Sequence, residues 1–401
     1  NKSRLCLKIF RTFSQNIDTF NFNSFFSNID SSLSKNQKNF LSDFFTSLLS
    51  SNSVNFDKIA THLSYKYDNI HFDSILKRIS RFLNNKNYNF HLLFDNVIKY
   101  VISNFKVKHN DNRIYLSIDH MYVKSKFTIL MISLRIGKQG IPIYFNSFYG
   151  KNHTLFGNAF KLKYIKSSIS YVHNLFKSII PNINIVFLAD RWFGNYFPLF
   201  HFIDKVLQDS FVFRCKDNFK VFYFDSSENN FIWTNIHKLP NYKYHSSFFN
   251  NLLFTKNKYK YNLTIGKSDG HKEPWFLISN VEPNRAKKYY SYRFGSIETI
   301  FKNQKSNGFN LEKTGLKSLH AFDNLYSLVC IGVIFLTCLG IDISKNSKCH
   351  KNLGFKVVKK TNDGKVRRVL SLFQAGLRLF KLFINSNKHY RVPFTFRLYD
   401  I

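Results

Sequence analysis

The sequence predicts an α/β protein in which a mixed sheet is flanked by helices, with an inserted β-rich subdomain and an N-terminal helical domain. Three observations predict this class. Apolar residues recur at helical spacing over residues 34–103. From residue 113, short apolar stretches typical of strands alternate with longer helical ones. Residues 217–274 are rich in Tyr, Phe and Asn and are typical of short strands and turns.

The predicted domain boundaries follow these changes of pattern. The chain has 401 residues, enough for several domains, and its hydrophobic content of 44% excludes a disordered chain. We expect a helical domain at 1–105, a core in two parts at 106–216 and 275–345, the β-rich insertion at 217–274 and a basic tail at 346–401.

Four N-terminal helices are predicted at 34–49, 54–63, 72–83 and 91–103. The third places Lys77, Arg78 and Arg81 on its outward face. Short helices that end in one with exposed basic residues resemble a helix-turn-helix DNA reader. An ordinary helical bundle with a solvated face explains the same pattern equally well.

The core pattern predicts a defined order of elements. Strands are expected at 113–119, 126–136 and 141–148, with a hairpin turn at 137–140, then a helix at 158–179 and a strand at 183–189. A helix at 196–207 and a strand at 211–216 follow. Three antiparallel strands, a helix and a parallel strand are the order of an RNase H-like fold, with helices on both faces of the sheet.

The late part of the chain is predicted to be helical. One helix begins at about Gly295, since Gly commonly marks a helix boundary. Residues 318–339 are apolar, but their longest apolar run is shorter than a membrane span, so a buried core helix is expected. Residues 367–384 form an amphipathic basic helix.

Charge gives the first indication of function. The 59 Lys and Arg residues against 24 Asp and Glu give a net charge of +35, which favours a polyanionic partner, with nucleic acid ahead of a membrane surface. The five Cys form no CxxC pair and show no zinc spacing with His, which is typical of a reduced cytosolic chain.

Three acidic residues are the candidate catalytic group. Asp119 and Asp190 are expected at the ends of two strands, and Glu298 on the late helix. Each Asp alone is more commonly a strand-end or capping residue. Together, three carboxylates in this arrangement would hold two Mg²⁺ ions about 3.5–4 Å apart, which Mn²⁺ could replace. Such ions activate water or a 3′-oxygen against a phosphodiester.

The stretch around Glu298 resembles the DDE transposases of bacterial insertion sequences, in the subgroup with a Tyr-Arg-Glu-Lys signature. Tyr290, Arg293, Glu298 and Lys305 match that signature, except that one residue too many separates Arg293 from Glu298. The resemblance implies that Asp119, Asp190 and Glu298 are catalytic. It also implies that the chain binds terminal inverted repeats as a dimer, cleaves them and joins them to target DNA.

Further residues are candidate DNA contacts. Tyr290, Arg293, Lys302 and Lys305 would hold phosphates, with loss of Lys305 more damaging than loss of Arg293. The resemblance implies that Trp275 stacks on a flipped base; the alternative is a buried core residue. Arg191 would hold a phosphate or pair with a carboxylate. His120 and His153 are expected in solvated or core roles.

Two other classes remain open. One is a catalytically inactive DNA-binding derivative of a transposase. The other is a basic membrane-surface protein that uses its apolar tail. For the transposase itself we expect a bacterial cytoplasmic, nucleoid-associated location and no membrane.

Overall fold

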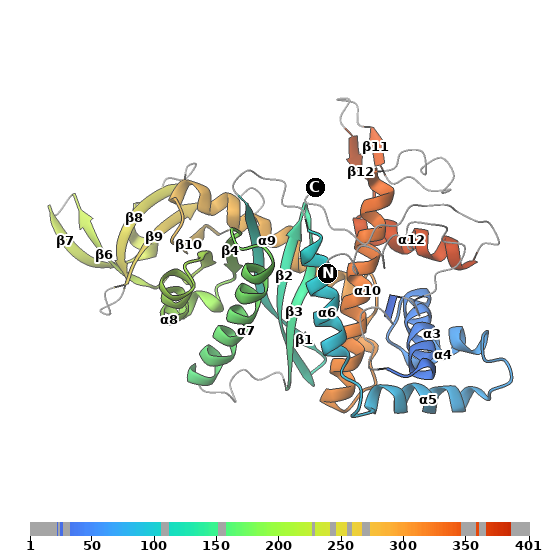
Figure 1. Ribbon diagram of the computed structural model, residues 1–401. Coiled ribbons are helices and arrows are strands. Elements are labelled where there is room, and N and C mark those ends of the chain that lie inside the picture. The colour runs from blue at the N-terminus through green and yellow to red at the C-terminus, as the bar shows by residue number, and fades with distance from the viewer. Residues whose placement is uncertain are drawn as a thin grey trace.

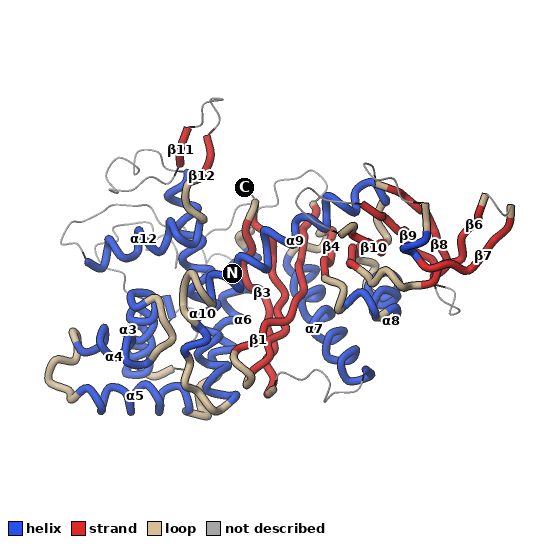
Figure 2. Tube along the Cα trace, turned by 180° about the vertical axis from the view of Figure 1, so that it is seen from behind, coloured by secondary structure: helices blue, strands red, loops and turns tan. Residues whose placement is uncertain are grey.

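The protein is described by a computed structural model. It describes residues 22, 25, 26, 33–105, 112–150, 158–226, 229–240, 246–254, 259–266, 273–345, 358–360 and 366–385. The chain is a mixed α/β protein with N-terminal helices, a ten-stranded mixed sheet and C-terminal helices (Figure 1). Viewed from behind, the helices of residues 35–84 lie at one end of the molecule and strands β6 and β7 at the other (Figure 2).

The four predicted N-terminal helices are confirmed. Polar side chains cap the start of three of them. At the first, the Ser34 hydroxyl accepts a hydrogen bond from the Gln37 N–H, and the Gln37 side chain accepts one from the Ser34 N–H. Apolar residues at helical spacing form a shared core with α10 (Leu319–Lys345). The helices are α3 (Lys35–Ser51), α4 (Phe56–Ser64), α5 (Phe72–Asn84) and α6 (Phe90–Ser103).

The first half of the sheet has the strand order β3-β2-β1-β4-β5. β1 and β2 are antiparallel, as are β2 and β3, whereas β1, β4 and β5 run parallel. The predicted hairpin turn is confirmed, since Gly137 has a φ of 57° between β2 and β3. The strands are β1 (Arg113–Val123), β2 (Phe127–Ile136), β3 (Gln139–Tyr149), β4 (Asn184–Ala189) and β5 (Ser210–Arg214).

The predicted insertion is β-rich, but its strands continue the same sheet. β10 (Trp275–Ser279) pairs antiparallel with β5 on one side and with β9 on the other. The sheet therefore runs on without a break in the order β10-β9-β8-β6-β7. The added strands are β6 (Lys220–Asp225), β7 (Asn230–Asn235), β8 (Ser247–Phe254) and β9 (Tyr259–Gly266).

Helices cover both faces of the first half of the sheet. α7 (Asn158–Ile179) packs on one face, for example through the rings of Tyr144 and Tyr171. α9 (Pro283–Gln304) and α10 pack on the other face, where Phe127 stacks on Phe322 of α10. Two short helices between β4 and β5 follow: α8 (Phe197–His201) and the π-helical η4 (Phe202–Val206).

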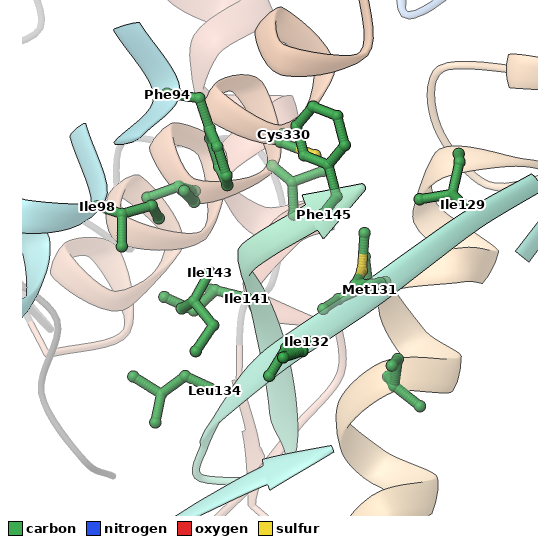
Figure 3. Close-up of a cluster of buried hydrophobic side chains, with 14 of the residues drawn as sticks. Phe94, Ile98, Ile129, Met131, Ile132, Leu134, Ile141, Ile143, Phe145 and Cys330 are labelled. Atoms are coloured by element: carbon green, nitrogen blue, oxygen red, sulfur yellow. The ribbon is translucent and has the colours of Figure 1, made fainter. Parts of the chain in front are cut away.

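Figure 3 shows part of the buried cluster beneath these helices, where Phe94 of α6 and Cys330 of α10 lie beside Phe145 of β3. Among the described residues, α10 is the one helix that is long and apolar enough to cross a membrane. The mean hydropathy of its most apolar 18-residue window is 2.2. In the structure 89% of that window is buried inside the protein. The prediction of a buried core helix is therefore confirmed.

The tail helix also packs into the protein. α12 (Leu372–Asn385) lies against α10. At the crossing, a Cβ on Gly340 would lie 1.9 Å from the Leu372 carbonyl oxygen, and one on Gly376 would lie 1.8 Å from that of Leu336. The two glycines therefore bring the helices into direct backbone contact. Before α12, β11 (Val358–Lys360) and β12 (Val366–Arg368) form a small hairpin.

Candidate active site

Asp119 and Asp190 occupy equivalent positions on two neighbouring parallel strands. The pairing of β1 with β4 ends at Ile118 and Ala189, and each Asp is the next residue. The prediction that Asp119 ends its strand is wrong, because β1 continues to Val123 by pairing with β2. Only the parallel pairing of β1 with β4 ends there, just before Asp119. Both carboxylates therefore still lie where the two strands stop pairing.

Strand alternation directs Asp119 toward α9. Alternate residues of a strand point to the same side, so Tyr115, Ser117 and Asp119 share one side of β1. Tyr115 packs on Tyr289 of α9, so this side faces α9. His120, on the other side, stacks on the Phe193 ring with centroids 5.0 Å apart. His120 is therefore a half-buried residue packed among aromatic rings, and His153 lies outside the described residues.

Arg293 of α9 joins the three predicted acids. One terminal nitrogen, Nη2, donates a hydrogen bond to Asp119 Oδ2 and lies 4.0 Å from Asp190 Oδ2. The other, Nη1, lies 3.5 Å from Glu298 Oε1. The Arg293 side chain is 7% exposed, Asp190 34% and Glu298 50%, so the cluster opens to solvent on the Glu298 side.

The prediction that the helix begins near Gly295 is wrong. α9 begins at Pro283, which suits the first turn of a helix, and passes through Gly295. A Cβ on Gly295 would lie 2.8 Å from the Lys138 carbonyl oxygen, so this glycine allows the helix to approach the β2–β3 turn. Arg293 thus lies within the helix, and its long side chain still reaches Glu298.

The charges in the cluster do not balance. Burial, together with the neighbouring Asp190, raises the pKa of Asp119 to about 6 against the lowering effect of Arg293. Three carboxylates face one guanidinium, so the fully ionised cluster carries two surplus negative charges. An oxygen-only donor set with surplus negative charge fits Mg²⁺ or Mn²⁺ in its chemistry.

The acids are nevertheless turned toward Arg293. Within the described ranges, no group of three or more His, Cys, Asp or Glu side chains is arranged to hold a metal ion. The Arg293 Nε is buried and has no hydrogen-bond partner. The Arg293 guanidinium therefore lies between the acids, where divalent metal ions were predicted.

Tyr290 and Trp275 are buried next to the cluster. Tyr290 is 1% exposed and Trp275 is 2% exposed. Their rings meet edge to face at 5.1 Å, and Trp275 stacks on Phe294. Burial raises the pKa of Tyr290 to about 12, although Arg293 lowers it. In this structure both side chains are core residues, and neither presents a face to DNA.

Apart from Arg293, the basic contacts predicted near the acids lie outside the cluster. The Lys305 ammonium pairs with Glu312 at 2.9 Å, because α9 ends at Gln304 and the chain turns there. Lys302 is exposed on the last turn of α9. Arg191 follows Asp190 but lies 3.3 Å from Glu273, the carboxylate pairing that the sequence left open.

The basic residues of α5 differ among themselves. Lys77 and Arg81 are exposed, whereas the Arg78 guanidinium lies 4.3 Å from the centre of the Phe40 ring and 5.0 Å from that of Tyr67. Arg78 therefore packs between helices, which corrects its predicted outward position. Lys77 and Arg81 remain available to a partner.

Two residues were not predicted from the sequence: Tyr122, close to Asp119 and Asp190, and Glu312, the partner of Lys305. Tyr122 is 37% exposed, and burial together with Asp119 and Asp190 raises its pKa. Glu312 accepts a hydrogen bond from the Lys124 N–H just beyond β1 and pairs with Lys305. The continuation of β1 through HMYV was the available signal for Tyr122.

Comparison with known proteins yields no relative: no protein-family model matches the chain, and no curated protein matches it.

Proposed function

We propose that this protein is a DNA transposase with a DDE-type RNase H-like core, which binds the ends of its element and catalyses metal-dependent DNA cleavage and strand transfer. The observation that carries the proposal is the meeting of Asp119, Asp190 and Glu298 around Arg293. These acids come from two adjacent strands and one helix, far apart in the sequence.

The sheet supports the RNase H-like part of the proposal. The order β3-β2-β1-β4-β5, with β2 antiparallel to β1, is the order expected for such a core. Strands β6 to β9 occupy the position of the β-rich insertion before the last acid. The net charge of +35 supports a polyanionic substrate.

Asp119, Asp190 and Glu298 would hold the divalent cations. Bound there, Mg²⁺ would supply activation of the attacking oxygen and stabilisation of the leaving oxygen. Arg293 would leave the carboxylates and donate to a DNA phosphate, which its two terminal nitrogens suit. Lys77 and Arg81 of α5 would contact DNA farther along the molecule, and synapsis of two ends would require a dimer.

The test uses the full chain and duplexes that carry the inverted repeats flanking its gene. We expect Mg²⁺-dependent release of a 3′-hydroxyl at the element boundary, lost in Asp119→Asn. If the chain binds these ends but does not cleave them in Mg²⁺ or Mn²⁺, the proposed enzymatic activity is excluded. Binding no better than to random duplex would reject element-end recognition.

A second candidate is the inactive DNA-binding derivative, and Arg293 is the observation that favours it. A guanidinium that lies within 4.0 Å of all three acids offsets part of their negative charge without a metal ion. The same cleavage test separates the two candidates. The membrane-surface alternative has less support, because the apolar face of α12 is buried against α10.

A further inference from the structure

The far end of the sheet carries an exposed group of aromatic rings. In the hairpin of β6 and β7, Phe222 pairs with Trp233 and Phe224 with Phe231. Directly paired residues point to the same face, so the four rings share one face, which we call the aromatic face. Phe224 is 42% exposed, Phe231 55% and Trp233 43%.

The rings of the aromatic face form a continuous surface. Phe222 and Phe231 are stacked with centroids 5.2 Å apart and planes at 19°. Trp233 lies 5.4 Å from Phe222, and Phe224 lies 5.1 Å from Phe231. A row of four large rings on one strand pair, three of them exposed to water, is typical of a binding surface.

Lysines flank this surface on the same face. Lys220 lies two residues before Phe222 on β6. The row that joins Trp233 and Phe222 continues through Leu253 to Lys260, which is exposed. Asp225 belongs to the opposite face, because it alternates with Phe224. The aromatic face therefore combines ring surfaces with positive charge.

We propose that the aromatic face binds unpaired bases of single-stranded DNA, with Lys220 and Lys260 on the flanking phosphates. Aromatic rings accept any base by stacking, and lysines follow the backbone, which is the chemistry of sequence-tolerant single-strand binding. A second copy of the chain fits less well, since it would bring a like charge of +35 toward the same lysines. The choice of DNA rests on the proposed function, whereas the chemistry of the surface does not.

The position of the hairpin separates this surface from the predicted duplex contacts. β6 and β7 lie at the opposite end of the molecule from α5, and strands β1 and β4 lie between them (Figure 1, Figure 2). Asp119 is on β1, and Asp190 directly follows β4. DNA strands that separate near the acids could thus bind the aromatic face, which is remote from the helix that carries Lys77 and Arg81.

The test measures binding of a labelled oligothymidine of about 12 nucleotides to the full chain without divalent metal. We expect Phe231→Ala with Trp233→Ala to weaken binding about tenfold or more, from the loss of two stacked bases. Trp233→Phe should retain most of the affinity. Thr234→Ala, on the opposite face of the same strand, should bind like the wild type.

The lysines give a second readout. Lys220→Gln with Lys260→Gln should reduce the salt slope of oligothymidine binding by about 1.4, the value for two released counterions on a single strand. Equal binding by wild type and the double alanine variant would overturn this proposal while leaving the cleavage test untouched. So would a loss of dimer in sedimentation with unchanged oligothymidine binding, because the face would then join two copies.

Discussion

Arg293 precedes Glu298 by five residues on one continuous helix, yet its Nη1 lies 3.5 Å from the Glu298 carboxylate. A five-residue step turns a helix by about 140°, so the two Cα–Cβ bonds point apart. The long guanidinium side chain spans this difference and reaches Asp119 as well. The extra residue in the signature therefore leaves Arg293 among the acids.

The first prediction concerns the three acids. Asp119→Asn, Asp190→Asn and Glu298→Gln should each reduce single-turnover cleavage at least a thousandfold (about 4 kcal/mol), because each removes a charged oxygen donor. Binding of element ends should persist in a mobility-shift assay. Glu282→Gln makes the same charge change at the exposed start of α9 and should cleave normally. Normal turnover by any of the three variants would remove that residue from the site.

The second prediction separates Arg293 from Lys305. Without Arg293 three carboxylates repel one another, so Arg293→Ala should lower the melting temperature and increase the stabilisation that Mn²⁺ provides. Cleavage should also fall. Lys305→Ala removes only a pair with Glu312 and should change both properties little.

Thermal melts of both variants with and without Mn²⁺ measure this difference. It reverses the order expected from the sequence, in which Lys305 was the more important residue. A Mn²⁺ effect in Arg293→Ala no larger than in the wild type would show that the guanidinium does not compete with cations.

The third prediction concerns α5. Lys77→Ala with Arg81→Ala should weaken binding to element ends more than binding to random duplex, in competition assays at fixed salt. Arg78 is left in place because its removal would disturb the contact with Phe40. An equal loss on both duplexes would mean that the helix contacts phosphates only.

The fourth prediction is a dependence of stability on pH. Partial burial by itself would raise the pKa of Glu312, but the Lys305 ammonium and the Lys124 N–H lower it below its usual 4.5. A carboxyl group whose pKa is lower in the folded than in the unfolded protein stabilises the folded state at pH values above its unfolded-state pKa. This contribution disappears as the pH falls through its folded-state pKa.

The measurement is urea unfolding of the wild type and Glu312→Gln. At pH 7 the variant should be less stable by about 0.5 kcal/mol, since the pair is partly exposed. At pH 3 the difference should shrink. A constant difference at both values would mean that packing, and not charge, is lost.

The fifth prediction concerns Gly295. Gly295→Ala places a methyl group 2.8 Å from the Lys138 carbonyl oxygen and should destabilise the protein by about 1–3 kcal/mol. Because α9 carries Arg293 and Glu298, cleavage should fall as well. Gly315→Ala meets nothing within 4 Å and serves as the control. Equal stability of the two variants in urea would contradict the close approach.

Local patterns predicted the elements that depend on local physics. The helix at 158–179 has the predicted bounds, and the strand predicted at 126–136 is observed at Phe127–Ile136, because helical spacing and a short apolar run bounded by polar residues decide them. Gly295 was misread, since a glycine has the same signature at a helix boundary and at a close packing contact. Which face of the sheet each acid takes became clear only from strand register.

Non-local pairing explains what the sequence left undecided. Nothing in the apolar pattern of β10 says that it joins β5 to β9, and that pairing makes the insertion part of one sheet. Arg293 likewise appeared as a residue beside the helix, because the reach of a long side chain to Asp119 is a tertiary property.

The sheet also has a consequence for synthesis of the chain. β5 ends at Arg214, but the strand that covers its edge does not begin until Trp275. As the polypeptide leaves the ribosome, β5 keeps an open edge that can pair with other chains until β10 arrives. Arg293 and Glu298 come later still, so Asp119 and Asp190 stand together without a counter-charge during that interval. The nascent protein thus completes its sheet, and then its charge-paired acids, only after residues 275–304 have been made.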